Sequence, residues 1–145
     1  MNAIDRARAY LAGDVTLAVV GERDYTFTER GVNALCNLAE SSPELLRGAA
    51  VADKIVGKAA ALLMALGGVK QVYAEVMSRS AQQVFEKYNI PCDCGQAAET
   101  IKNRAGTGQC PTEQTVRHID DPAAALKAIR RTQRVLRVRA QGGYE

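Results

Sequence analysis

In the middle third of the chain, short apolar segments alternate with longer stretches of helical periodicity, and this alternation constrains the fold more than any other feature. The predicted elements are strands at Ala49–Val51, Val69–Met77 and Ile90–Cys94, separated by helices at Asp53–Leu66 and Ser80–Tyr88. Strands joined through a helix run parallel in one sheet. The segment therefore predicts an α/β layer domain whose later strands are parallel.

The first 48 residues predict a helix, a hairpin and a second helical region. Asn2 and Gly13 are suited to the two ends of a first helix. Strands at Val15–Val20 and Tyr25–Thr28 flank a turn, and the helical pattern of Gly31–Ser41 continues in a further turn up to Gly48. The whole order predicts a three-layer α-β-α sandwich with a five-stranded mixed sheet.

Size and composition favour one domain. The chain has 145 residues, of which 47% are hydrophobic, and it is long enough for one core but short for two. The longest apolar run, Ala59–Leu66, is well below the roughly 20 residues that span a bilayer. No charged-then-apolar leader opens the sequence, so we expect a cytoplasmic location with free cysteine thiols.

Positive charge is concentrated at the C-terminal end. Residues 122–145 have a net charge of +5, against −2 for the first 121 residues. We therefore divide the chain into an α/β domain at 1–121 and a basic helix and tail at 122–145, packed on it or extending from it. This helix is either a solvated terminal helix or a surface for RNA, DNA or a protein. It carries no aromatic residue that could stack on single strands.

Three strings together resemble one family. They are AVADKIVGKAAALL at Ala50–Leu63, GGVKQVYA at Gly67–Ala74 and NRAGTGQCPTE at Asn103–Glu113. They resemble DUF1893, a bacterial and archaeal family of uncharacterised proteins, and the likeness runs from about Ala7 to Leu126. The resemblance implies a cytidine-deaminase-like fold, which agrees with the order of elements. It implies no activity, because none is established for the family.

The ligands of a zinc deaminase are not found where that fold would need them. Such enzymes use a His or Cys two residues before a Glu, and Pro-Cys-x-x-Cys at the next helix start. The corresponding positions, about Glu29–Gly31 and Ala52–Lys54, contain neither thiol nor imidazole, and His118 has no glutamate two residues later. The sequence therefore predicts no zinc cofactor.

Cys92 and Cys94 raise a second metal hypothesis, with Cys110 as a third ligand. Residues two apart in a strand share a face, so the spacing is geometrically allowed. Structural zinc sites favour two or more intervening residues. We interpret the pair as side chains that fill the face of a sheet, and we predict no metal site.

The helix predicted to begin at Asp53 offers an anion site. Free backbone N–H groups at a helix start attract phosphates and carboxylates, and Lys54 and Lys58 share one helix face. Asp53, Lys54 and Lys58 are therefore candidate ligand-binding residues at the carboxyl end of a strand. The alternative is an ordinary N-cap with two solvated lysines.

The glycine-rich loop before Pro111 carries the best candidate nucleophile. Cys110 would lie at the N-cap of a helix over Pro111–Ile119, where the helix start favours a thiolate. Arg104, Asn103 and Thr107 would supply charge and hydrogen bonds to an anionic ligand. Glu113 is suited to capping at the third helical position.

Taken together, the residues predict a protein that binds a nucleotide-like or other anionic small molecule, with no cofactor and no membrane. An exposed edge strand would allow a homodimer. Two alternatives stay open. One is a cysteine-dependent enzyme using Cys110, for which His118 is the only histidine available as a base. The other is a nucleic-acid or protein interaction module using the arginine-rich C-terminal helix.

Overall fold

The computed structural model describes residues 1–103, 106 and 108–140. The elements of this part of the chain are, in order, α1 (Ala3–Tyr10), β1 (Leu17–Val20), β2 (Asp24–Phe27), α2 (Asn33–Ser41), α3 (Pro43–Leu46), β3 (Ala50–Val56), α4 (Lys58–Gly67), β4 (Gln71–Ser78), α5 (Arg79–Lys87), β5 (Cys92–Ala98), α6 (Pro111–Thr115) and α7 (Pro122–Ala140).

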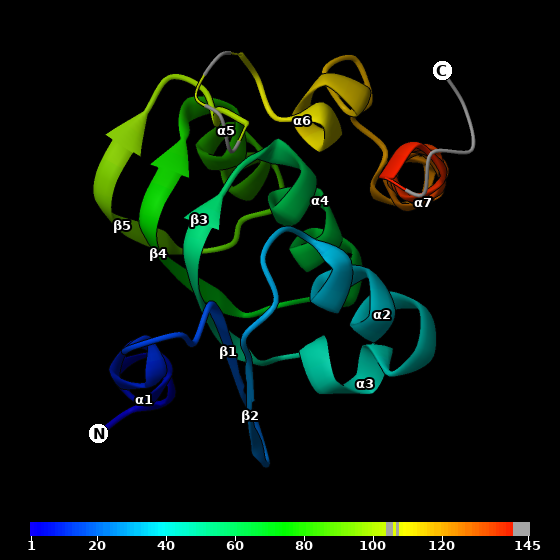
Figure 1. Ribbon diagram of the computed structural model, residues 1–145. Helices are drawn as coiled ribbons and strands as arrows, with labels where there is room; N and C mark the ends of the chain where they lie inside the picture. The colour runs from blue at the N-terminus through cyan, green and yellow to red at the C-terminus, as the bar shows by residue number, and fades with distance from the viewer. Residues whose placement is uncertain (104–105, 107, 141–145) are drawn as a thin grey trace.

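The strands form one mixed sheet in the order β2-β1-β3-β4-β5. β1 pairs antiparallel with β2 and β3, whereas β3, β4 and β5 are mutually parallel. α1 covers one face of the sheet, and α2, α4 and α5 cover the other (Figure 1). The predicted α/β class, the five-stranded mixed sheet and the parallel later strands are confirmed.

The core has two unequal parts because the sheet is covered on both faces. Leu17 and Val19 of β1 point into the larger part beneath α2, α4 and α5, while Ala18 and Val20 point into the smaller part beneath α1. Strands covered on both faces are expected to be apolar throughout. All four residues of β1 are accordingly buried.

α4 is the central helix of the larger core. It is apolar on almost every face, and its buried residues are Ala59, Ala60, Ala61, Leu62, Leu63, Met64 and Gly67. A Cβ on Gly67 would lie 2.6 Å from both Cβ and Cδ1 of Leu46, so α3 packs directly against the α4 backbone. A helix that is apolar on all sides is enclosed by the core.

The predicted helix start at Asp53 is wrong. Asp53 lies within β3, opposite Leu17 of β1 and Ala74 of β4, and the ladder continues to Val56 opposite Met77. β3 is thus paired on both sides, and these pairings outweigh the local preference of an Asp for the N-cap. The helix begins only at Lys58, after Gly57.

Two further boundaries differ from the predicted ones. β5 runs to Ala98 because it stays paired with β4 as far as Ser78, although its sequence has little β-propensity. α6 ends at Thr115 rather than continuing to Ile119.

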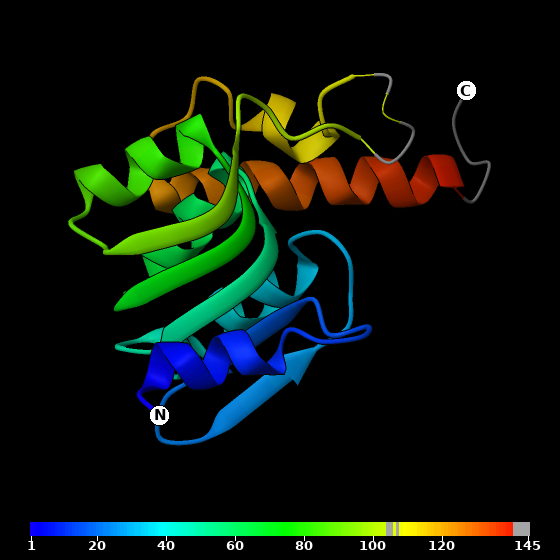
Figure 2. The same cartoon turned by 90° about the vertical axis from the view of Figure 1, so that its left-hand side faces the viewer.

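α7 lies across α4 on the outside of the molecule, and Figure 2 shows its C-terminal part extending beyond the sheet. Ala125, Ala128 and Ile129 form its buried side. Arg130 attaches the helix to α2 through the Glu40 carboxylate and the side-chain oxygens of Asn33 and Asn37. Within the described residues, no helix has the length and apolar character needed to cross a membrane.

Replacing Gly67 with Ala tests the packing of α3 against α4. The added methyl overlaps Leu46, and overpacking costs typically about 1–3 kcal/mol, so the free energy of unfolding in a urea titration should fall by about that amount. The control is Gly21→Ala, whose Cβ would meet Ala49 only at 3.9 Å. Equal stability of both variants and the parent would contradict the packing described.

Candidate functional site

The carboxylate of Glu113 occupies the N-terminus of α4. Its Oε1 accepts a hydrogen bond from the Lys58 backbone N–H at 2.7 Å, and its Oε2 accepts one from Ala59 at 2.8 Å. The Glu113 residue is only 5% exposed. Free N–H groups and the dipole at a helix start favour an anion. At α4, that anion is a side chain of the protein itself.

Gly57 makes this close approach feasible. A Cβ at this position would collide with the Glu113 carboxylate. Gly57 also provides no side-chain cap of its own, so Glu113 caps the helix from more than 50 residues away along the chain. The strings Ala50–Leu63 and Asn103–Glu113, far apart in sequence, therefore meet at this contact.

Lys58 makes a second connection between the same segments. Its Nζ donates to the Arg117 carbonyl at 3.2 Å and to Asp120 Oδ1 at 3.1 Å. The Lys58 side chain is only 13% exposed. The hydrogen bond from Lys58 lowers the pKa of Asp120. Lys58 thus holds the segment after α6 against α4.

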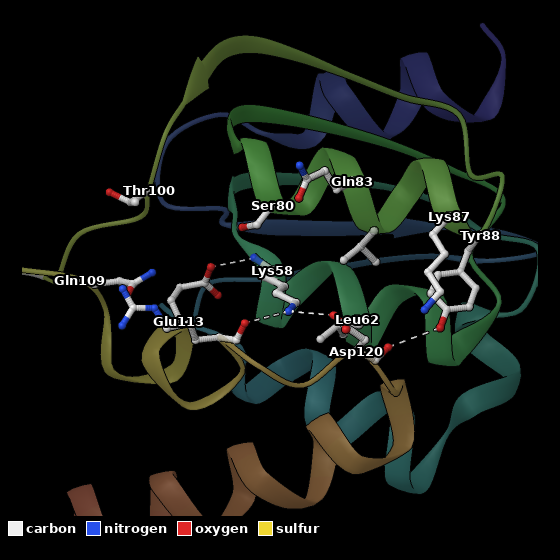
Figure 3. Close-up of a pocket in the computed structure, with 12 residues that line it drawn as sticks. Lys58, Leu62, Ser80, Gln83, Lys87, Tyr88, Thr100, Gln109, Glu113 and Asp120 are labelled. Carbon is white, nitrogen blue, oxygen red and sulfur yellow. Dashed lines mark hydrogen bonds and ion pairs between the residues drawn. The ribbon is translucent and has the colours of Figure 1, made fainter.

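A cavity of about 480 Å³ lies beside these contacts (Figure 3). α4 and α5 form one part of its wall, and the segment from Thr100 to Asp120 forms the rest. The lining residues are Lys58, Leu62, Ser80, Gln83, Val84, Lys87, Tyr88, Thr100, Gln109, Glu113, Arg117 and Asp120.

The two carboxylates of the cavity wall have hydrogen-bonding partners, whereas two of its cations form no ion pair among the described residues. Glu113 is bound to the α4 N-terminus and Asp120 to Lys58. Lys87 contacts the Tyr88 ring at 5.5 Å. Neither Lys87 nor Arg117 forms an ion pair with any residue that the structure describes. The cavity therefore has two cations available to an anion.

The neutral polar groups lie largely away from Lys87. In Figure 3, Thr100 and Gln109 lie at one end of the cavity and Lys87 and Tyr88 at the other, with Ser80 between them. Hydroxyl and amide groups both donate and accept hydrogen bonds. The cavity can thus contact an anionic group at one end and a neutral polar group at the other.

Of the residues predicted at the helix start, only Lys58 lines this cavity. Asp53 is a partly buried residue of β3, and burial raises its pKa to about 7, against the opposing effect of the hydrogen bond from the Ile55 backbone N–H. Lys54 Nζ donates to the Gly13 carbonyl at 2.7 Å. The premise of an anion site at Asp53 and Lys54 is therefore wrong, because no helix begins there.

The described residues at the two ends of the predicted glycine-rich loop pair with each other. Lys102 bridges to Gln109, and the Asn103 N–H donates to the Gly108 carbonyl at 2.7 Å. Cys110 is the N-cap residue of α6, as predicted, with its Sγ 3.2 Å from Thr112 Oγ1. Arg104 and Thr107 lie outside the described residues. Catalysis by Cys110 stays a prediction.

The other cysteines lie on β5 and α2. Cys92 is exposed, Cys94 packs partly against the core, and Cys36 is buried. Desolvation and the neighbouring Cys94 raise the pKa of the Cys92 thiol. Within the described part of the chain, no group of three His, Cys, Asp or Glu side chains is arranged to hold a metal ion.

Sequence reasoning missed the contribution of α5 and the true partner of Glu113. Glu113 does lie at the third position of α6, but its carboxylate points to α4 instead of capping its own helix. The cavity-wall residues Gln83, Lys87 and Tyr88 belong to α5 and its C-cap. They are spaced one turn or one residue apart and form no sequence motif. Only packing against α4 brings them to the cavity.

Known structures and families agree with this architecture. The crystal structure of a DUF1893 family protein from Thermotoga maritima matches with a TM-score of 0.79 over 89% of each chain, at 23% sequence identity. The model of the domain of unknown function DUF1893 matches residues 9–132. The chain therefore belongs to the DUF1893 family, as its motifs predicted. A comparison with curated proteins finds no match.

Removing the Glu113 carboxylate should weaken the attachment of α6 to α4. Hydrogen bonds to charged groups contribute about 1.5–3 kcal/mol each, and Glu113 accepts two of them, so Glu113→Ala should lower the free energy of unfolding by about 3–6 kcal/mol. Hydrogen exchange at the Lys58 and Ala59 amides should accelerate more than exchange in β3. The control is Glu99→Gln, which removes an exposed ion pair with Arg79 and should cost less than about 1 kcal/mol. Unchanged exchange at Lys58 and Ala59 would contradict this role.

The raised pKa of Asp53 should make the free energy of unfolding depend on pH. Because its folded pKa of about 7 lies above the ordinary value of 3.8 for an aspartate, the folded state binds the proton more tightly, and stability is lost as pH rises from about 4 through 7. Asp53→Asn should therefore be more stable than the parent at pH 8, by roughly 1–3 kcal/mol, and nearly equal to it at pH 4. Urea titrations at the two pH values measure this, with the exposed Asp14→Asn as control. A difference that does not change with pH would refute it.

Proposed function

We propose that the cavity between α4, α5 and the segment 100–120 binds a small organic anion of nucleotide-like chemistry. The observation that carries the proposal is the charge pairing in the cavity wall. Both lining carboxylates already accept hydrogen bonds, whereas Lys87 and Arg117 form no ion pair with any described residue. Such a wall attracts an anion more strongly than a cation.

Size and polarity support a ligand larger than an inorganic ion. The cavity volume of about 480 Å³ lies within the range of roughly 300–1,000 Å³ for small-molecule sites. Lys87 and Arg117 would contact a phosphate or carboxylate. Ser80, Thr100 and Gln109 can exchange hydrogen bonds with a sugar or a base, and Leu62 and Val84 supply apolar surface.

The nucleotide part of the proposal also draws on the family resemblance. The cytidine-deaminase-like assignment that the resemblance implies is an analogy of fold, which has little weight for function by itself. The predicted ligand-binding residues Asn103, Arg104 and Thr107 precede Gln109, a residue of the cavity wall, by two to six positions in the sequence. Their contact with the ligand is part of the proposal.

Native mass spectrometry of the purified protein, followed by calorimetric titration with nucleoside mono-, di- and triphosphates, tests this function. Binding to at least one of these ligands is expected. Lys87→Gln with Arg117→Gln should weaken it at least tenfold, because each charge-assisted hydrogen bond contributes about 1.5–3 kcal/mol. The control is Arg47→Gln with Lys70→Gln, which removes the same charge from exposed positions outside the cavity.

Comparing the two double variants distinguishes binding in the cavity from an effect of net charge alone. Equal weakening by both would mean that the ligand responds only to net charge. If none of the nucleotides binds, the proposal that the ligand is nucleotide-like is wrong.

A further inference from the structure

The outer side of α7 carries a stripe of basic residues, which we call the α7 stripe. It consists of Lys127, Arg130, Arg131, Arg134 and Arg137, and no acidic residue occurs between Pro122 and Ala140. At 3.6 residues per turn, these five residues fall within an arc of about 120°. The buried residues Ala125, Ala128 and Ile129 lie on the opposite side. The stripe therefore faces away from the core.

Only one residue of the α7 stripe forms an ion pair with another described residue. Arg130 is bound to Glu40 of α2. Lys127, Arg131, Arg134 and Arg137 are all exposed, and none forms an ion pair with another described residue. These four cations are available to a partner.

The α7 stripe is held on a fixed support. The first half of the helix is anchored by Ile129 in the core, by Arg130 on α2, and by a hydrogen bond of 2.6 Å between the Thr132 and Thr115 hydroxyls. From there the helix continues beyond the sheet (Figure 2). A cationic helix that is already folded loses little entropy when a partner binds.

We propose that the α7 stripe binds the phosphate backbone of double-stranded DNA. Its charges extend over about 15 Å of helix, and an α-helix fits the major groove of a duplex. Arginine guanidinium groups pair with phosphate oxygens through two parallel hydrogen bonds. α7 has no aromatic residue on which unpaired bases could stack, which favours duplex over single strands.

An acidic protein surface fits the stripe less well. Protein interfaces usually have an apolar centre surrounded by charges. The large exposed apolar side chains of α7, Val135 and Leu136, lie outside the arc of the stripe. The arc therefore presents charge without an apolar anchor, which is the pattern that a polyphosphate backbone requires. This inference is independent of the proposed cavity function.

Fluorescence anisotropy with the full chain and a labelled duplex of about 24 base pairs, between 50 and 200 mM salt, tests the proposal. Four phosphate contacts predict a log–log slope of about −3.6. Replacing Arg131, Arg134 and Arg137 together with Gln should reduce the slope to about −0.9 and weaken binding at 50 mM salt at least tenfold. The matched control replaces Arg23, Arg47 and Lys70, all exposed in connections between other elements, with Gln.

The proposal is supported if the control binds like the parent and the α7 variant does not. Equal weakening by both variants would overturn it in favour of a net-charge effect. A single strand of the same length that binds as tightly as the duplex would also overturn it. Displacement of the duplex by poly-glutamate at an equal concentration of charge would overturn the proposal as well. Circular dichroism melting of each variant verifies that the fold is retained.

Discussion

The contact between the Glu113 carboxylate and the α4 N-terminus is the interaction on which the rest of the candidate site depends. α4 is the central helix of the core, and its first N–H groups have no partner within their own helix. Glu113 satisfies two of them and, with Lys58 as a second connection, holds α6 and the following segment against α4. The wall of the cavity exists because these two segments are held together.

The sequence predicted the order of elements well because the alternation of apolar strands and helices is strong between Ala49 and Cys94. It failed where pairing within the sheet overrides local preference. Asp53 is a good N-cap residue by type, yet β1 and β4 hold it in a strand from both sides. No local pattern distinguishes these alternatives, since the deciding hydrogen bonds come from residues more than 20 positions away.

The site was less predictable than the fold for a related reason. Lys58 was identified from a helix predicted to begin at Asp53, and the helix that forms begins at Lys58 itself. Lys87, Tyr88 and Arg117 were not, because their positions follow only from the packing of α5 and the segment after α6 around α4. Glu113 was assigned to the correct position on its own helix, but the sequence does not show that a neighbouring helix start lies closer to its carboxylate.

The ion pairs also change how the charge of the chain is understood. The formal net charge of +3 suggests only a mildly basic protein. In the folded chain, however, Lys58 and Arg130 hold elements together by pairing with Asp120 and Glu40, and these two basic residues are therefore committed to the fold. Among the described basic residues without an ion pair, Lys87 and Arg117 lie at the cavity, and Lys127, Arg131, Arg134 and Arg137 lie along the outer side of α7. These cations are exposed and hydrated in the free chain, and their clustering raises the local positive potential that attracts an anion, so these two places are where an anionic partner is to be sought.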